Sequence, residues 1–339
     1  MRTGKRTLAY SRRVIVDSEQ GLLCPDGRFH LDPLQPVERA VITHAHGDHA
    51  RAGGASYLCS EDCAALIRRR VGPEARIETL AYGERRRIGE VTVSLHPAGH
   101  MLGSAQVRIE GRGGVWVLSG DYKREPDPTC APFEPLPCDV FVTESTYALP
   151  LFRWDEPAAV ARDIVGWWEG NPGKASVLFC YALGKAQRLL AEIARLTDRP
   201  VWVHGAVESF AEIYRARGVK LSQTRHVAEE KGLLGELVLA PLTARGTPWM
   251  KRFRAFETAF ASGLLRIRGT RRRRGFDRGF VVSDHADWPG LLATIRETGA
   301  SRVLAVHGYR EALVRWLRES GLDAAPIGAA HAPLDPEGD

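Results

Sequence analysis

The sequence predicts an α/β protein that is built either as one large domain or as two linked domains. At 339 residues the chain is long for a single compact domain, and its 44% of apolar residues contain no run long enough to span a membrane. Short apolar, β-branched runs alternate with loops up to about residue 150, and helical patterns alternate with strands after it. This change in the pattern of expected secondary structure indicates two structural parts.

The individual elements follow from the same patterns. In the first part, buried strands are expected at 14–16, 41–42, 91–95, 115–118 and 140–142. In the second, helices are expected at 158–170 and 185–196, with strands at 176–180 and 201–205 between and after them. Two further strands are expected at 279–282 and 302–306. No internal repeat or low-complexity linker interrupts the series.

The cysteines and the N-terminal residues bear on the compartment. The six cysteines are scattered and form no Cys-x-x-Cys pair, so burial as small apolar residues is expected. The first 16 residues are basic but lack the apolar core of a secretion signal. We therefore expect a cytoplasmic protein with no membrane association.

The positive charge of the chain is concentrated in one segment. Residues 251–278 hold ten basic and two acidic residues, whereas the rest of the chain holds 37 basic and 39 acidic residues. Such a segment is either a solvated loop or a surface for a polyanion such as nucleic acid. The residues of interest are Lys251, Arg252, Arg271, Arg272, Arg273 and Arg274. For the interleaved Trp249, Phe253 and Phe256, core packing is favoured over base stacking.

Six polar residues stand where expected strands end. In chain order they are His44, His100, Asp121, Glu144, His285 and His307. Loops that leave strand ends carry functional side chains on a rigid scaffold. If all these strands share one sheet and its carboxyl edge, the six loops converge.

The stretch HAHGDH at 44–49 is the most specific of these features. Alternate side chains of an extended segment point the same way, so His44 and His46 are able to bind one cation. Gly47 permits a sharp turn, after which Asp48 and His49 are able to bind a second. Four polar side chains beside an apolar strand are hard to bury without a cation. Imidazoles with a carboxylate favour zinc, and manganese is the alternative.

Two cations need more ligands than this loop supplies. We expect His100 to complete the first site, His307 to complete the second, and Asp121 to bridge the two. His96 stands four residues before His100 and is the rival ligand. Taken singly, each of these residues has an ordinary alternative as a hydrogen-bonding or capping residue.

These motifs resemble a known family. HAHGDH, PAGHMLGSA and SGDY resemble the metal motifs of the metallo-β-lactamase fold. TESTY, SDHAD and AVHGY resemble the three additional motifs of the β-CASP nucleases, and YALGKAQRLL resembles the start of their inserted domain. The longer stretches at 120–150 and 271–292 are similar to bacterial ligase-associated DNA exonucleases.

The resemblance implies both a fold and an activity. The fold is an αββα metallo-β-lactamase sandwich, residues 1–150 and 277–339, with an inserted α/β β-CASP cap domain at 151–276. The activity is phosphodiester hydrolysis by a hydroxide that two divalent metals activate. In this scheme Asp48 serves the metal site, His285 is the general acid, and Glu144 orients His285 and raises its pKa. A buried salt bridge or strand-end cap is the alternative role for Glu144.

The substrate and partners follow from the resemblance alone. It implies DNA repair, with a DNA ligase and a helicase as partners. One residue favours an RNA substrate instead. His307 is typical of RNA-processing members of the family, whereas DNA-acting members of the Artemis type tend to carry valine at this position. The longer stretches favour DNA, and an RNA-processing ribonuclease is the alternative. A small-molecule metallohydrolase and a non-catalytic nucleic-acid-binding subunit are the remaining classes.

Overall fold

The structure is a computed structural model that describes residues 13–328, and it contains three sheets. The first sheet consists of β1 (Val16–Ser18), β2 (Gly21–Cys24), β3 (Phe29–Leu31), β4 (Arg39–Val41), β5 (Ser56–Ser60) and β6 (Ile77–Leu80). The second has the order β19 (Asp323–Pro326), β18 (Arg302–Val306), β11 (Val140–Glu144), β10 (Gly114–Leu118), β9 (Ala105–Gly111), β8 (Val91–Pro97), β7 (Arg85–Ile88). The third has the order β14 (Thr224–His226), β13 (Val201–Val203), β15 (Leu237–Ala240), β12 (Ala175–Phe179), β16 (Phe256–Ala261), β17 (Arg278–Phe280).

Seven α-helices cover these sheets within the described residues. They are α1 (Ala64–Val71), α2 (Pro157–Glu169), α3 (Lys185–Ile193), α4 (Gly205–Ala216), α5 (Thr270–Arg273), α6 (Trp288–Thr298) and α7 (Arg310–Glu319). None of these helices has both the length and the apolar character needed to cross a bilayer. The expectation of a mixed α/β protein is confirmed.

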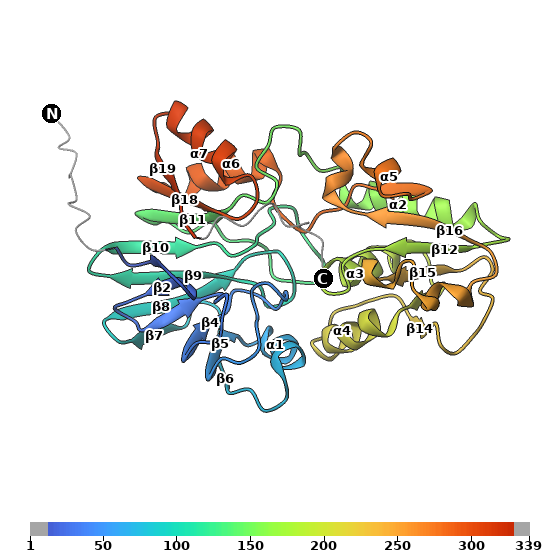
Figure 1. Cartoon of the computed structure of the whole chain (residues 1–339), viewed down its shortest axis with the longest axis horizontal. Coiled ribbons are helices and arrows are strands. Elements are labelled where there is room, and N and C mark those ends of the chain that lie inside the picture. Colours follow the sequence, from blue (N-terminus) through green and yellow to red (C-terminus); the bar gives the residue numbers. More distant parts are fainter. Residues whose placement is uncertain (1–12, 329–339) are drawn as a thin grey trace.

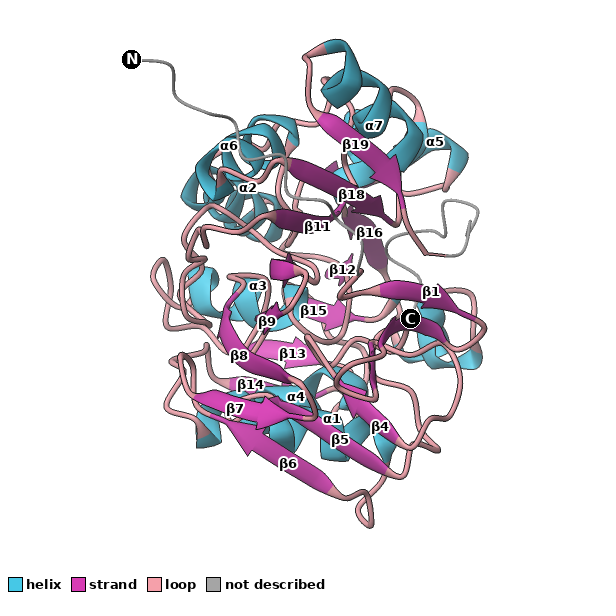
Figure 2. Ribbon diagram, turned by 90° about the vertical axis from the view of Figure 1, so that its left-hand side faces the viewer, coloured by secondary structure: helices cyan, strands magenta, loops and turns pink. Residues whose placement is uncertain are grey.

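The first lobe consists of the first two sheets with α1, α6 and α7, and it is layered (Figure 1). One apolar core lies between the two sheets, where Val41 and Leu58 pack with Val93 and Leu118. A second core fills the space between the outer face of the second sheet and helices α6 and α7. Helix α1 covers the outer face of the first sheet. Figure 2 shows α7 beside β18 and β19, in agreement with this order of layers.

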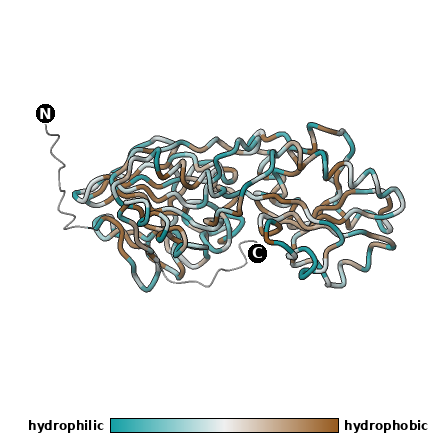
Figure 3. The backbone as a smooth tube through the Cα atoms, turned by 90° about the horizontal axis from the view of Figure 1, so that it is seen from above, coloured by the Kyte–Doolittle hydropathy of each residue, from teal (hydrophilic) through white to brown (hydrophobic). Residues whose placement is uncertain are grey.

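The second lobe consists of the third sheet with α2, α3, α4 and α5. All pairs of neighbouring strands in this sheet are parallel, as the alternation of strands and helices predicts. Hydrophobic segments run through the interior of both lobes (Figure 3). Strand β17 pairs with β16, so the third sheet extends a few residues beyond the expected boundary at position 276.

The expectation that one sheet carries all six loops is wrong. Strands β8, β10, β11 and β18 run in the same direction in the second sheet, so the residues that follow them meet at its carboxyl edge. The loop at 44–49 instead leaves β4 of the first sheet, and His285 follows β17 of the third. Convergence therefore depends on how three sheets pack, which local periodicity does not report.

Candidate metal centre

Three imidazoles meet where the carboxyl edges of the first two sheets adjoin. His46 Nδ1 lies 3.1 Å from His44 Nε2 and 3.1 Å from His100 Nε2. All three side chains are buried. Ligand nitrogens of a tetrahedral zinc site with Zn–N bonds of 2.0–2.1 Å are separated by about 3.3 Å. The spacing of these nitrogens therefore fits a cation bound between them.

Asp121 lies between this group and a second one. Its Oδ2 is 3.5 Å from His44 Nε2, 3.5 Å from His49 Nε2 and 3.9 Å from His100 Nε2. Asp48 Oδ2 is 3.6 Å from the same His49 nitrogen. The central carboxylate is thus within reach of ligands on both sides, as a bridging ligand requires.

His307 lies beside the second group. Its ring centroid lies 5.4 Å from that of His49. Its backbone has a positive φ of 56°, a conformation that residues other than glycine rarely adopt and that is enriched at functional sites. His96 lies outside both groups, because its ring nitrogens face Ser94 and Glu134. The structure therefore brings His100, and not the rival His96, to the metal centre.

Each imidazole is held through the ring nitrogen that points away from the centre. His46 Nε2 donates to the carbonyl of Leu183 at 3.1 Å, and His100 Nδ1 donates to the carbonyl of Asp284 at 2.8 Å. Such partners orient the ring and leave the other nitrogen free to bind a metal. Burial lowers the pKa of both His46 and His100 to about 4, so both are neutral ligands at pH 7.

Asp32 anchors two further rings and was missed by the sequence analysis. Its carboxylate accepts a hydrogen bond from His49 Nδ1 at 2.8 Å and one from Thr43 Oγ1 at 2.6 Å. Thr43 Oγ1 in turn lies 3.0 Å from His44 Nδ1, so one carboxylate orients a ring of each group. The sequence feature that could have identified Asp32 is its position directly after a short strand, Phe29–Leu31, and before Pro33.

Replacing Asp32 with asparagine should lower zinc affinity by roughly 10–100-fold, because the amide keeps the size of the side chain but loses the charge that orients both rings. Asparagine also tolerates the left-handed backbone at this position, where φ is 42°. Competition with a chromophoric chelator measures the affinity. The exposed Glu19 provides a control as Glu19→Gln, which should bind zinc as the wild type does. Unchanged affinity of Asp32→Asn would refute the anchoring role.

Glu144 and His285 form a pair beside the metal centre. His285 Nδ1 donates to Glu144 Oε2 at 2.9 Å and lies 4.0 Å from Asp121 Oδ2. Burial by itself lowers the pKa of His285, yet the charges of Glu144 and Asp121 raise it to about 9. A dication at Asp121 would offset the second charge, which leaves Glu144 as the group that keeps this imidazole protonated.

The second lobe contributes directly to the site. Leu183, which anchors His46, lies in the loop between β12 and α3, and the ring of Tyr181 from the same loop lies 4.9 Å from that of His46. Trp154 Nε1 donates to the carbonyl of His285 at 2.7 Å. The metal centre therefore lies at the junction of the two lobes and depends on both.

The basic residues singled out from the sequence do not belong to this cluster. Arg271 donates to the carbonyl of Phe276 at 3.2 Å, and Arg273 donates to that of Arg268 at 3.1 Å. Arg252 bonds to the carbonyl of Val227. These three guanidinium groups stabilise loops of the second lobe, and part of their hydrogen-bonding capacity is used there.

Fold and site together define a class, the α/β proteins with a cluster of histidine and aspartate side chains that is able to hold metal ions. The chain is 31% identical over 321 residues to a probable DNA ligase of Opitutus terrae, which covers 92% of this chain and 31% of that protein. It is 30% identical over 171 residues to a ribonuclease of Thermus thermophilus, and that alignment covers 41% of this chain and 39% of the ribonuclease. More narrowly, these and other relatives are β-CASP nucleases of the metallo-β-lactamase type, and this chain is similar to them over part of their length.

Two further comparisons bear on the fold. A protein of unknown function from Enterococcus faecalis V583 superimposes with a TM-score of 0.58 at 11% identity, over 87% of this chain and 80% of that one, which shows similarity of fold alone. No family model matches the sequence. The chain spans about a third of the length of the ligase relative.

Proposed function

We propose that this chain is a metal-dependent DNA exonuclease that hydrolyses phosphodiester bonds, in repair together with a DNA ligase and a helicase. The position of Asp121 between two groups of imidazoles carries the proposal, because that arrangement suits two cations and a phosphodiester between them. In this proposal the first lobe is an αββα metallo-β-lactamase core, and the second lobe is the inserted β-CASP domain.

The residues fit two divalent cations, with zinc favoured. His44, His46 and His100 would hold one, Asp48, His49 and His307 the other, and Asp121 both. Bound there, the cations would stabilise charge on the phosphoryl oxygens and ease ionisation of the attacking water.

Glu144 and His285 would handle the proton of the leaving group. Glu144 fixes the ring of His285 through Nδ1, so Nε2 is the nitrogen that carries a proton to the departing sugar oxygen. Because the pair is held beside Asp121, this donor stands next to the metal centre and not in bulk solvent. Asp48 supports the second cation and lies closest to His49.

DNA is favoured over RNA by the extent of similarity. The similarity to the ligase relative runs through 92% of this chain, whereas that to the Thermus ribonuclease covers 41%. One observation favours the alternative, an RNA-processing ribonuclease: His307, typical of RNA-acting relatives, lies beside His49 at the metal centre.

Digestion of matched DNA and RNA strands tests the proposal. Single strands of one sequence, labelled at either the 5′ or the 3′ end, are incubated with the zinc- or manganese-loaded protein. We expect stepwise shortening of DNA at least about tenfold faster than of RNA, and loss of cleavage with a chelator. Faster cleavage of RNA would establish the alternative, and no cleavage of either strand by metal-loaded protein would overturn the nuclease assignment.

A further inference from the structure

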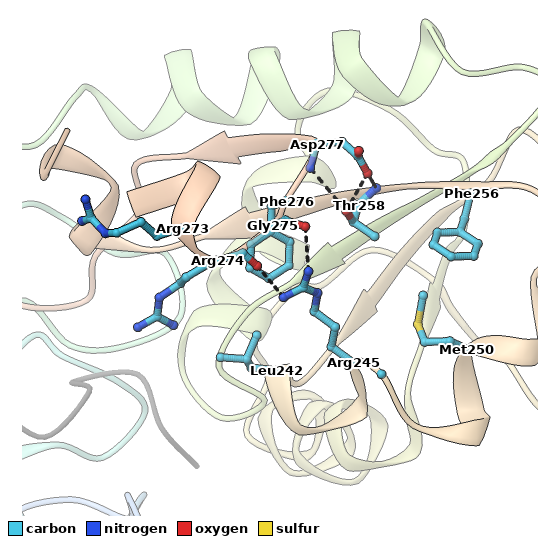
Figure 4. Close-up of a pocket in the computed structure, with 11 residues that line it drawn as sticks. Leu242, Arg245, Met250, Phe256, Thr258, Arg273, Arg274, Gly275, Phe276 and Asp277 are labelled. Atoms are coloured by element: carbon cyan, nitrogen blue, oxygen red, sulfur yellow. Dashed lines mark hydrogen bonds between the residues drawn. The ribbon is translucent and has the colours of Figure 1, made fainter. Parts of the chain in front are cut away.

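The two faces of the third sheet are covered differently. Helices α2, α3 and α4 pack on one face, where their side chains join Leu178, Val203 and Leu239 in a single apolar core. The opposite face is covered by short 3₁₀ turns at 242–244 and 248–252 and by residues 273–277. A pocket of about 800 Å³ opens among these segments (Figure 4).

The two ends of this pocket differ in chemistry. Arg273 and Arg274 lie at one end, and Phe256 and Met250 lie at the other (Figure 4). Phe256 is 42% exposed, which makes it one of the few exposed large apolar residues among those that the structure describes. A cationic end and an accessible aromatic ring in one pocket are the two groups that recognise a nucleotide, through its phosphate and its base.

The middle of the pocket is held in place by internal contacts. Arg245 donates from Nη1 and Nη2 to the carbonyls of Arg274 and Gly275, both at 2.6 Å, and its guanidinium lies 4.1 Å from the centre of the Phe276 ring. Asp277 accepts from the backbone N–H and the hydroxyl of Thr258, at 2.8 and 2.6 Å. The one carboxylate in the pocket is therefore engaged, and the lining has a positive balance that suits an anion.

The pocket runs lengthwise along β16. Phe256 is the first residue of that strand, while the Arg274 guanidinium lies 5.2 Å from the ring centre of Phe260 near its end. Because the strands of the third sheet are parallel, their carboxyl ends lead to the metal centre, through Leu183 after β12 and His285 after β17. The arginine end is thus the end nearer to the metal centre. Phe256 lies at the opposite end of the strand, about 13 Å before Phe260.

We propose that this pocket binds one nucleotide of an unpaired strand beyond the metal centre, with its phosphate at Arg273 and Arg274 and its base against Phe256 and Met250. The inference rests on the proposed function, because it assumes a nucleic-acid substrate. The contacts are to the phosphate and to the face of the base, so they hold the strand without reading its sequence.

Phe256→Ala tests the stacking contact. Anisotropy of a fluorescent 15-nucleotide single strand, measured with the full chain in chelator so that no cleavage occurs, should show about tenfold weaker binding. The control is Leu234→Ala, which removes an equally exposed apolar side chain of the second lobe that does not line the pocket. Hydrolysis of bis(p-nitrophenyl) phosphate, which is too small to reach the pocket, should be unchanged in both variants.

Arg273→Gln tests the phosphate contact. It should reduce the slope of log affinity against log salt by about 0.7, the value for one phosphate contact on a single strand. Far-UV circular dichroism and the unfolding midpoint show whether the loss of its bonds to Arg268 and Thr270 has changed the fold. If neither variant changes strand binding while the wild type cleaves DNA, the pocket proposal falls and the nuclease stands. If binding depends on Phe256 but the metal-loaded wild type cleaves no strand, the pocket stands and the nuclease assignment falls.

Discussion

Replacing Asp121 with alanine is expected to lower the rate of phosphodiester cleavage by at least about 1,000-fold. Among the described residues, its Oδ2 is the one carboxylate oxygen found within 4 Å of imidazole nitrogens from both groups, at His44, His49 and His100. Without it, two cations bound there would lose the ligand that the proposal assigns to both and the charge compensation that it supplies. Loss of several kcal/mol of transition-state stabilisation corresponds to a rate loss of this size.

Two measurements separate this effect from misfolding. Metal content per folded chain should fall below that of the wild type, while anisotropy in chelator should show that single-strand binding persists. Glu134→Gln is a matched control, because Glu134 is an exposed carboxylate beside His96, which lies outside the metal centre. Cleavage by Asp121→Ala within tenfold of the wild type would rule out the bridging assignment.

The sequence predicts those site residues that lie together in one loop or directly after one strand. HAHGDH places His44, His46 and His49 on one turn directly after β4, so its composition alone indicated a cation. Asp121 and His307 were predicted because each follows an apolar strand. In each case a short stretch of chain carries both the scaffold and the functional group.

The parts that the sequence did not predict involve contacts between distant segments. The close approach of the first two sheets is one example: Gly120, at φ 57°, lies so near Thr43 that a Cβ there would come within 2.7 Å of the threonine side chain. The residues around Gly120 do not predict that Thr43 lies next to it. The anchoring of His46 by Leu183 likewise crosses 137 positions of sequence. Register and packing, and not propensity, decide such contacts.

Arg188 is the clearest residue of this kind. It lies on α3 of the second lobe, and in the sequence it looks like any polar residue of an amphipathic helix. In the structure it is buried, with Nη1 donating to the carbonyl of Ser283 at 2.6 Å and to Asp284 Oδ1 at 3.2 Å. Its Nε lies 3.7 Å from Asp127 Oδ2. One guanidinium therefore compensates two buried carboxylates and links the lobes.

Arg188→Leu should destabilise the protein by about 3–5 kcal/mol, because two buried carboxylates lose the counter-charge that they share. Chemical denaturation measures the loss, and Arg188→Lys, which keeps the charge but not the fork of donors, should recover part of it. A loss below about 1 kcal/mol in Arg188→Leu would contradict the compensating role.

The same variant should also respond differently to acid. Burial by itself raises the pKa of Asp284, but the charges of Lys185 and Arg188 lower it to about 2, compared with the usual 3.8. A carboxylate with a lowered pKa contributes stability above its unfolded pKa and loses that stability as the pH falls toward the folded value. In the wild type this loss falls between about pH 4 and pH 2. Without Arg188 the folded pKa rises, so acid unfolding should begin at a higher pH.

This charge network also reaches the metal centre. The carbonyl of Asp284 accepts the hydrogen bond that orients His100, and Arg188 holds both Ser283 and Asp284 in place. Arg188→Leu should therefore lower zinc affinity even at neutral pH, where the protein remains folded, by up to about tenfold. A variant that loses stability but binds zinc as the wild type does would show that Arg188 joins the lobes without positioning His100. Reduced affinity, with recovery in Arg188→Lys, would show that the second lobe helps to build the metal centre that the first lobe carries.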